Sequence, residues 1–146
     1  MLSVIDKELI LMVGPIGSGK TTFAKSLENN NSIRISQDEM GRKQYLKNFK
    51  EAIDQEIPRI IVDRQNFNRE QRARFIEPAR EAGYIVTIFE MGTPKELCIQ
   101  RVVNRKAHPT VKGEDPELAE SILNMFERNY EKPTEVEFDN YNLVEE

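Results

Sequence analysis

The chain has 146 residues, enough for one domain with a hydrophobic core but too few for two. No stretch approaches the ~20 consecutive apolar residues of a membrane span, so we expect a cytoplasmic protein without a membrane partner. One cysteine, Cys98, and one histidine, His108, exclude an internal disulfide and a Cys/His metal cluster. We therefore predict a single domain over residues 1–146, with Cys98 in its core.

The formal net charge of −4 is unevenly distributed. Residues 114–146 form an acidic C-terminal segment with eleven acids against Arg128 and Lys132, a net of −9, which leaves +5 for residues 1–113. A basic body is compatible with a phosphate-rich substrate, although charged runs are usually solvated surfaces.

Apolar segments of strand length alternate with helical segments, which is typical of a parallel sheet covered by helices. The expected strands are residues 9–13, 33–36, 60–63, 84–89 and a short strand within 136–144. The expected helices are residues 22–28, 39–56, 68–82, one that begins at Pro94 behind a capping box from Thr93 to Glu96, and one capped by Asp115. Asn68 is expected to cap its helix, Pro78 to kink it, and residues 104–115 to form a mobile lid. The pattern predicts an α/β fold with a mostly parallel central sheet of four or five strands, helices on both faces and a helical lid.

The segment from Gly14 to Thr21 matches the phosphate-binding pattern G-x-x-x-x-G-K-[ST], and it lies between an expected strand and an expected helix. Glycines let the backbone turn tightly and point N–H groups at a polyphosphate, and the helix adds its positive N-terminal end. Lys20 is expected to reach the β and γ phosphates, and Thr21 to ligate Mg²⁺. The predicted nucleotide-binding residues are Gly14, Pro15, Ile16, Gly17, Ser18, Gly19, Lys20, Thr21 and Thr22.

Two acids follow expected strands on the rim where open parallel sheets bind their ligands. Asp38 follows the second strand, where its carboxylate would either accept the proton of an acceptor hydroxyl or cap the next helix. Asp63 ends the third strand and would hold Mg²⁺ through water, bind substrate or cap a turn.

Arginines form two groups near the same rim. Arg101 and Arg105 lie four residues apart beside the lid, where they would either stabilise charge on the transferred phosphoryl group or complement a helix dipole. His108 is interpreted as a lid residue near phosphate rather than a base. The second group would grip a phosphate backbone or be ordinary surface residues; it comprises Arg64, Arg69, Arg72 and Arg74.

Four motifs occur in one order along the chain: residues 14–22, 35–38, 62–68 with Arg72, and 101–105. Together they resemble the kinase domain of 5'-hydroxyl polynucleotide kinases, both the phage end-healing enzymes and the kinase module of eukaryotic polynucleotide kinase-phosphatases. The resemblance implies a P-loop kinase fold that uses ATP, or another nucleoside triphosphate, with Mg²⁺. It implies that Lys20 and Arg105 are catalytic at the donor phosphates, with Arg101 beside them. On the acceptor side, the resemblance implies that Asp38 is the base that activates the 5'-hydroxyl and that Asp63 contacts the metal or the acceptor. The other acceptor residues that it implies are Arg64, Asn66 and Arg72.

One position departs from the phage pattern. Those relatives carry an arginine three residues beyond the base, where this chain has Gly41, so Arg42 is the nearby candidate for binding the acceptor. No phosphatase or ligase domain is attached, so separate proteins would complete end repair unless the chain is an excised module.

The resulting prediction is ATP-dependent phosphoryl transfer to the 5'-hydroxyl end of DNA or RNA. Two alternatives stay open: a kinase of a small hydroxylated molecule, nucleoside or modified base in DNA, and a nucleotide-binding switch or module without transfer activity. An extended basic groove would favour the polynucleotide, because a small-molecule pocket does not need one.

Overall fold

The structure is a computed structural model that describes residues 6–104 and 116–145, and of Asp38 it describes the backbone only. The expected cap Asp115, the lid from residue 105 onward, Arg105 and His108 therefore lie outside the described residues. No helix within the described ranges has both the length and the apolar character needed to cross a membrane.

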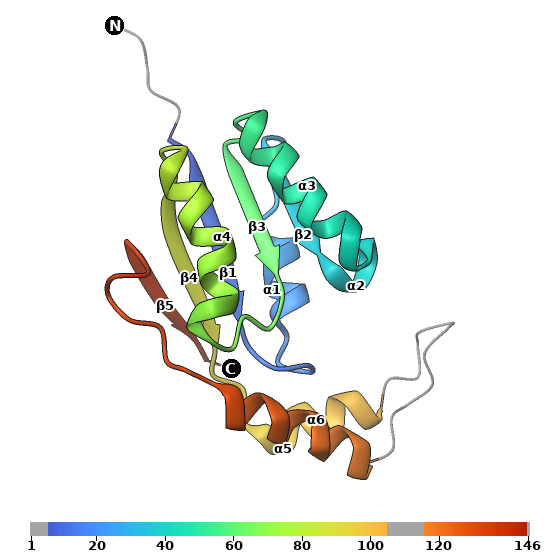
Figure 1. The fold of residues 1–146 in the computed structure, drawn as a ribbon. Helices are drawn as coiled ribbons and strands as arrows, with labels where there is room; N and C mark the ends of the chain where they lie inside the picture. The colour runs from blue at the N-terminus through green and yellow to red at the C-terminus, as the bar shows by residue number, and fades with distance from the viewer. Residues whose placement is uncertain (1–5, 105–115, 146) are drawn as a thin grey trace, which may run out of the picture.

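The centre of the fold is a five-stranded sheet in the order β2-β3-β1-β4-β5 (Figure 1). Its strands are β1 (Glu8–Val13), β2 (Ser32–Ser36), β3 (Arg59–Asp63), β4 (Ile85–Met91) and β5 (Asn140–Val144). All four pairings are parallel, so the carboxyl ends of the strands meet at one edge. This arrangement confirms the predicted parallel α/β fold.

The helices cover both faces of this sheet and the end at which its strands have their carboxyl termini. They are α1 (Lys20–Ser26), α2 (Gln37–Met40), α3 (Arg42–Asp54), α4 (Arg69–Glu81), α5 (Lys95–Val103) and α6 (Pro116–Asn129). In Figure 1, α3 and α4 lie over one face, α1 lies over the other, and α5 packs against α6 beyond the carboxyl ends of the strands.

The alternation of side chains along β1 divides the core between these two faces. Leu9 and Leu11 pack in the cluster that contains Phe49 of α3 and Phe75 of α4. The intervening residues of β1 pack in the cluster that contains Ala24 of α1. Because both faces are covered, β1 is a continuous apolar run, the feature that made it recognisable in the sequence.

Two expected helix boundaries were wrong. The helix expected over residues 39–56 is two helices, because Gly41 between α2 and α3 has φ 84°, a value that ends a right-handed helix. Thr93 does not cap α5: the cap residue is Pro94, and the Thr93 hydroxyl instead donates to the Ser18 carbonyl at 2.7 Å.

Two local predictions are confirmed. The Asn68 side chain accepts a hydrogen bond from the Gln71 backbone N–H at 2.9 Å and so caps α4, which continues through Pro78 to Glu81. Cys98 is fully buried in α5.

Candidate active site

The phosphate loop connects β1 to α1 in a tight turn. The Gly14 N–H donates to the Gln65 carbonyl at 3.1 Å, which ties the loop to the segment that follows β3. Gly17 has φ 78° and Gly19 has φ 88°, left-handed values that side chains with a Cβ rarely adopt. Gly17 and Gly19 are therefore required by the backbone conformation.

Helix α5 holds the other side of the loop. Arg101 donates from Nη1 to the Gly17 carbonyl at 3.3 Å, next to the bond from Thr93 to Ser18. A Cβ on Gly17 would lie 2.5 Å from the Cys98 carbonyl oxygen. The Arg101 side chain thus contacts the backbone of the phosphate loop.

Gly17→Ala should weaken ATP binding by about tenfold or more, since the new Cβ meets the α5 backbone as well as imposing left-handed strain of about 1–2 kcal/mol. Isothermal titration with ATP and urea unfolding would measure the two effects. Gly83→Ala is the matched control, because Gly83 also has φ 86° but a Cβ there meets only the flexible end of Lys7, at 3.7 Å. Equal ATP affinities for the two variants would contradict the tight α5 contact.

A cleft of about 280 Å³ opens beside the phosphate loop. Its wall combines the loop with α2, the end of β3, the start of α4 and α6; the lining residues are Ile16, Lys20, Gln37, Asp63, Arg64, Gln65, Phe67, Gln71 and Met125. Lys20 from the phosphate loop, and Asp63 and Arg64 from the motif at residues 62–68, are therefore brought together. Gln37 is the neighbour of Asp38 at the start of α2, which places the Asp38 backbone at the edge of this cleft.

The residues present fit a Mg²⁺ ion. Asp63 has a side chain that is 1% exposed, and its Oδ1 has no hydrogen-bond partner among the described residues. A buried carboxylate oxygen without a donor can be satisfied by a hard cation or its water. Thr21 lies exposed in the first turn of α1. No cluster of three or more His, Cys, Asp or Glu suited to a metal occurs in the described ranges.

Arg34 on β2 was not predicted, yet it organises the acceptor edge of the cleft. It donates from Nη1 to Asp63 at 3.0 Å and from Nη2 to both carboxylate oxygens of Glu39 at 2.7 Å. Burial disfavours the charged form, but the hydrogen bond and charge of Glu39, with the charges of Asp63 and Glu28, outweigh it and raise the pKa of Arg34. The contact with Arg34 lowers the pKa of Glu39. Arg34 thereby fixes α2, which carries Asp38, against the end of β3.

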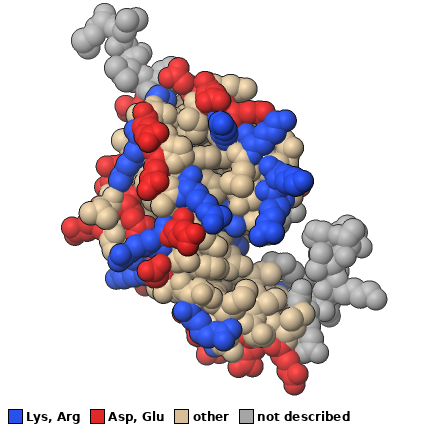
Figure 2. Space-filling model, in the orientation of Figure 1, with Lys and Arg blue, Asp and Glu red and all other residues tan. Residues whose placement is uncertain are grey.

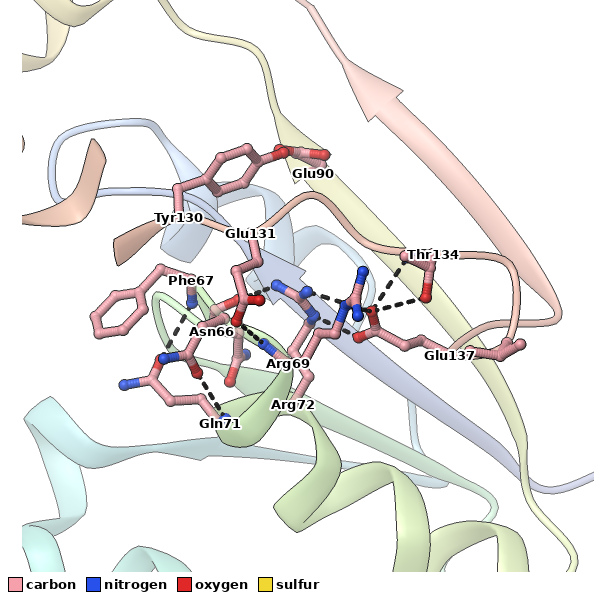
Figure 3. A network of polar contacts seen from close by, with 12 residues as sticks. Asn66, Phe67, Arg69, Gln71, Arg72, Glu90, Tyr130, Glu131, Thr134 and Glu137 are labelled. Atoms are coloured by element: carbon pink, nitrogen blue, oxygen red, sulfur yellow. Dashed lines mark hydrogen bonds and ion pairs between the residues drawn. The ribbon is translucent and has the colours of Figure 1, made fainter. Parts of the chain in front are cut away.

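Two of the predicted acceptor residues are buried and shape the loop between β3 and α4 (Figure 3). Asn66 has φ 48°, and its Nδ2 donates to the Met12 carbonyl at 2.8 Å. Arg72 is fully buried, donating from Nη1 to the Asn66 carbonyl at 2.9 Å and from Nε to Glu137 at 2.6 Å. The structure therefore places Arg72 behind the loop, where it supports the segment that carries Arg64 and Phe67 into the cleft.

The segment after α6 completes this support (Figure 3). The Glu131 N–H donates to the Phe67 carbonyl at 2.7 Å, and the Glu131 carboxylate accepts from the Arg69 N–H at 3.2 Å. Glu137 also accepts from the backbone N–H and the hydroxyl of Thr134, at 3.1 and 3.2 Å. Burial raises the pKa of Glu137, but the bonds and charge from Arg72 and Thr134 outweigh that effect and hold its pKa below the ordinary value.

The lowered pKa of Glu137 predicts a pH-dependent contribution to stability. Its folded pKa lies below the unfolded value of about 4.3, so the stabilisation is fully present above that pH and is lost as pH falls through the folded pKa. The difference in unfolding free energy between wild type and Glu137→Gln should therefore be largest at neutral pH and shrink toward zero in strong acid. Urea unfolding across that range measures it, and a pH-independent difference would contradict the assignment.

The remaining predicted arginines are spread apart. The Arg64 guanidinium lies 4.7 Å from the Tyr45 ring centroid and lines the cleft, whereas Arg74 is exposed and pairs with Glu70 at 3.5 Å. Arg42 is exposed at the first position of α3. The four arginines expected to grip a phosphate backbone therefore do not form one groove.

Comparison with known proteins places the chain in a family. The family described as AAA domain (AAA_33) matches residues 9–51 and 42–133. A protein of Acanthamoeba polyphaga mimivirus assigned as a bifunctional polynucleotide phosphatase/kinase is 28% identical over 94% of this chain, and "Transcription factor bHLH140" of Arabidopsis thaliana is 34% identical over 68%. The chain spans 33% and 12% of the lengths of these two relatives.

Solved structures show the same fold. Kti12 of Chaetomium thermophilum, in complex with ADP-AlF3, has a TM-score of 0.69 at 18% identity, covering 94% of this chain and 88% of its own. A protein of Chloroflexus aurantiacus assigned as a kinase also has a TM-score of 0.69, at 16% identity, covering 95% of this chain and 85% of its own. The fold is that of the P-loop kinases. By the match over most of its length, the chain belongs to the AAA_33 family of AAA domains.

Proposed function

We propose that the protein transfers a phosphoryl group from ATP, or another nucleoside triphosphate, to the 5'-hydroxyl end of DNA or RNA. The observation that carries the proposal is the cleft. Its wall beside α2 includes Lys20 of the phosphate loop, together with Asp63 and Arg64 at the end of β3. A donor phosphate on the loop and an acceptor at the α2 edge would therefore face each other. The polynucleotide assignment draws on the relative assigned as a polynucleotide phosphatase/kinase and on the four sequence motifs.

On the donor side, the backbone from Gly14 to Gly19 would surround the phosphates and Lys20 would neutralise their charge. Thr21 and Asp63 would hold Mg²⁺, which would supply positive charge to neutralise the donor phosphates. Arg101 would keep the loop in place from α5, with Arg105 as the arginine that contacts the donor phosphates.

On the acceptor side, Asp38 would accept the proton of the attacking hydroxyl, which is worth about 100- to 10,000-fold in rate. Arg64 and Arg42 would contact the acceptor phosphate. Asn66 and Arg72 would act indirectly, by holding the loop between β3 and α4 in the conformation that brings Arg64 into the cleft.

The proposal is tested by incubating the protein with γ-labelled ATP, Mg²⁺ and a panel of 5'-hydroxyl DNA, 5'-hydroxyl RNA, nucleoside 3'-monophosphates and nucleosides. We expect label on the oligonucleotides with a higher kcat/KM than on the nucleosides. Label on nucleosides alone would show a small-molecule kinase. Release of inorganic phosphate alone, with every acceptor, would show a nucleotide switch.

A further inference from the structure

Helix α3 carries a row of lysines that the sequence motifs did not include. Lys43, Lys47 and Lys50 are exposed and spaced i, i+4 and i+7, which places them on one side of the helix. The residues that α3 buries, Tyr45 and Phe49 among them, lie on the opposite side. We call these three lysines the α3 stripe.

The stripe presents positive charge to solvent. No carboxylate within residues 6–104 and 116–145 pairs with any of its lysines, and Arg42 lies exposed at the start of the same helix. Figure 2 shows Lys and Arg side chains gathered over α3, whereas acidic side chains lie mainly along the left of the view and at its lower end beside α6. The acids Glu51 and Asp54 in the last turn of α3 end the basic run. A positive surface of this kind is complementary to a phosphate backbone.

The stripe begins beside the cleft. Gln37 lines the cleft, and α3 begins five residues later at Arg42. From there α3 runs toward the opposite end of the sheet (Figure 1). The rise from Lys43 to Lys50 is about 10 Å, so the lysines can contact successive phosphates of one strand.

We propose that α3 is the path of the acceptor strand: the 5'-terminal nucleotide enters the cleft, and the phosphates that follow it contact Arg42 and the α3 stripe. This inference rests on the proposed function, since it assigns the substrate's path to that site. The α3 stripe, rather than the group of arginines after β3, would then bind the phosphate backbone of the acceptor. In that group Arg72 is buried and Arg74 is paired with Glu70.

The test compares wild type with a triple variant carrying Lys43→Glu, Lys47→Glu and Lys50→Glu, and with a milder triple to glutamine. A control triple carries the same charge change at exposed positions elsewhere: Arg74→Glu, Arg128→Glu and Lys132→Glu. Each is assayed for phosphorylation of a 5'-hydroxyl octanucleotide and of a nucleoside 3'-monophosphate. Binding of the same octanucleotide, labelled at its 3' end, is followed by fluorescence anisotropy from 50 to 200 mM salt.

The stripe variant should lose roughly 10- to 100-fold in kcat/KM for the octanucleotide and keep its activity on the monophosphate. The slope of log K against log salt should fall by about 2, or roughly 0.7 for each of three lost phosphate contacts. An equal loss in the control triple, or an unchanged slope in the stripe variant, would overturn the inference. If the wild type phosphorylates no acceptor, the proposed function fails. The anisotropy measurement then still tests whether the α3 stripe binds the oligonucleotide, and equal affinities of the wild type and the stripe variant would refute that binding.

Discussion

Asp38→Asn is expected to reduce kcat for phosphoryl transfer by about 100- to 10,000-fold, because the amide cannot accept the proton of the attacking hydroxyl. The affinity for ATP should stay at the wild-type value, since Asp38 is expected to act on the acceptor and not on the donor phosphates. Single-turnover transfer to a 5'-hydroxyl oligonucleotide, together with ATP titration, measures both quantities.

The control for this variant is Asp6→Asn, which makes the same change at an exposed acid that precedes β1. It should leave transfer unchanged. If Asp38→Asn transferred phosphate as fast as the control, Asp38 would not be the base. Asp63, the carboxylate that lines the cleft, would then be the next residue to test.

Arg72→Ala is expected to lower the free energy of unfolding by about 3–5 kcal/mol, because removing one partner of a buried ion pair leaves the other charge uncompensated. Glu137 would lose the bond from Nε, and the Asn66 carbonyl would lose the bond from Nη1. Urea unfolding at neutral pH measures the change. A loss below about 1 kcal/mol would show that the pair does not support the fold.

Two further variants separate the roles of Arg72. Arg74→Ala removes an exposed arginine from the same helix, and it should change the free energy of unfolding by no more than about 0.5 kcal/mol. The double replacement Arg72→Met with Glu137→Leu should restore much of the lost stability, since apolar pairs can replace buried ion pairs. If the double variant is stable but does not transfer phosphate, transfer needs the bonds or the charge of Arg72 and not only the stability that the ion pair gives. If it keeps transfer, Arg72 only supports the loop.

The fold and the donor half of the site were readable from the sequence because both depend on local patterns. The apolar run of β1, the glycine-rich loop and the Asn68 cap each lie within a few consecutive residues. The break between α2 and α3 was also local, because Gly41 with its positive φ interrupts the helix, but the weak periodicity of residues 39–56 concealed it. The lysine spacing of the α3 stripe was equally present in the sequence.

The supporting contacts of the acceptor half could not be read in this way. Arg34 reaches Asp63 across 29 residues, and Arg72 reaches Glu137 across 65. A charged residue in a strand or helix pattern is usually exposed, so neither arginine gave a local signal that it would be buried against a distant carboxylate. Only the packing of β2 on β3, and of the C-terminal segment on α4, brings these charges together.

The most direct test of the central claim uses two oligonucleotides of identical sequence, one with a 5'-hydroxyl and one with a 5'-phosphate, each incubated with the protein, γ-labelled ATP and Mg²⁺. We predict that label enters only the 5'-hydroxyl oligonucleotide and is recovered in its 5'-terminal nucleotide after nuclease digestion. Labelling of both oligonucleotides, or of neither while ATP is hydrolysed, would contradict the assignment of the cleft to 5'-hydroxyl ends.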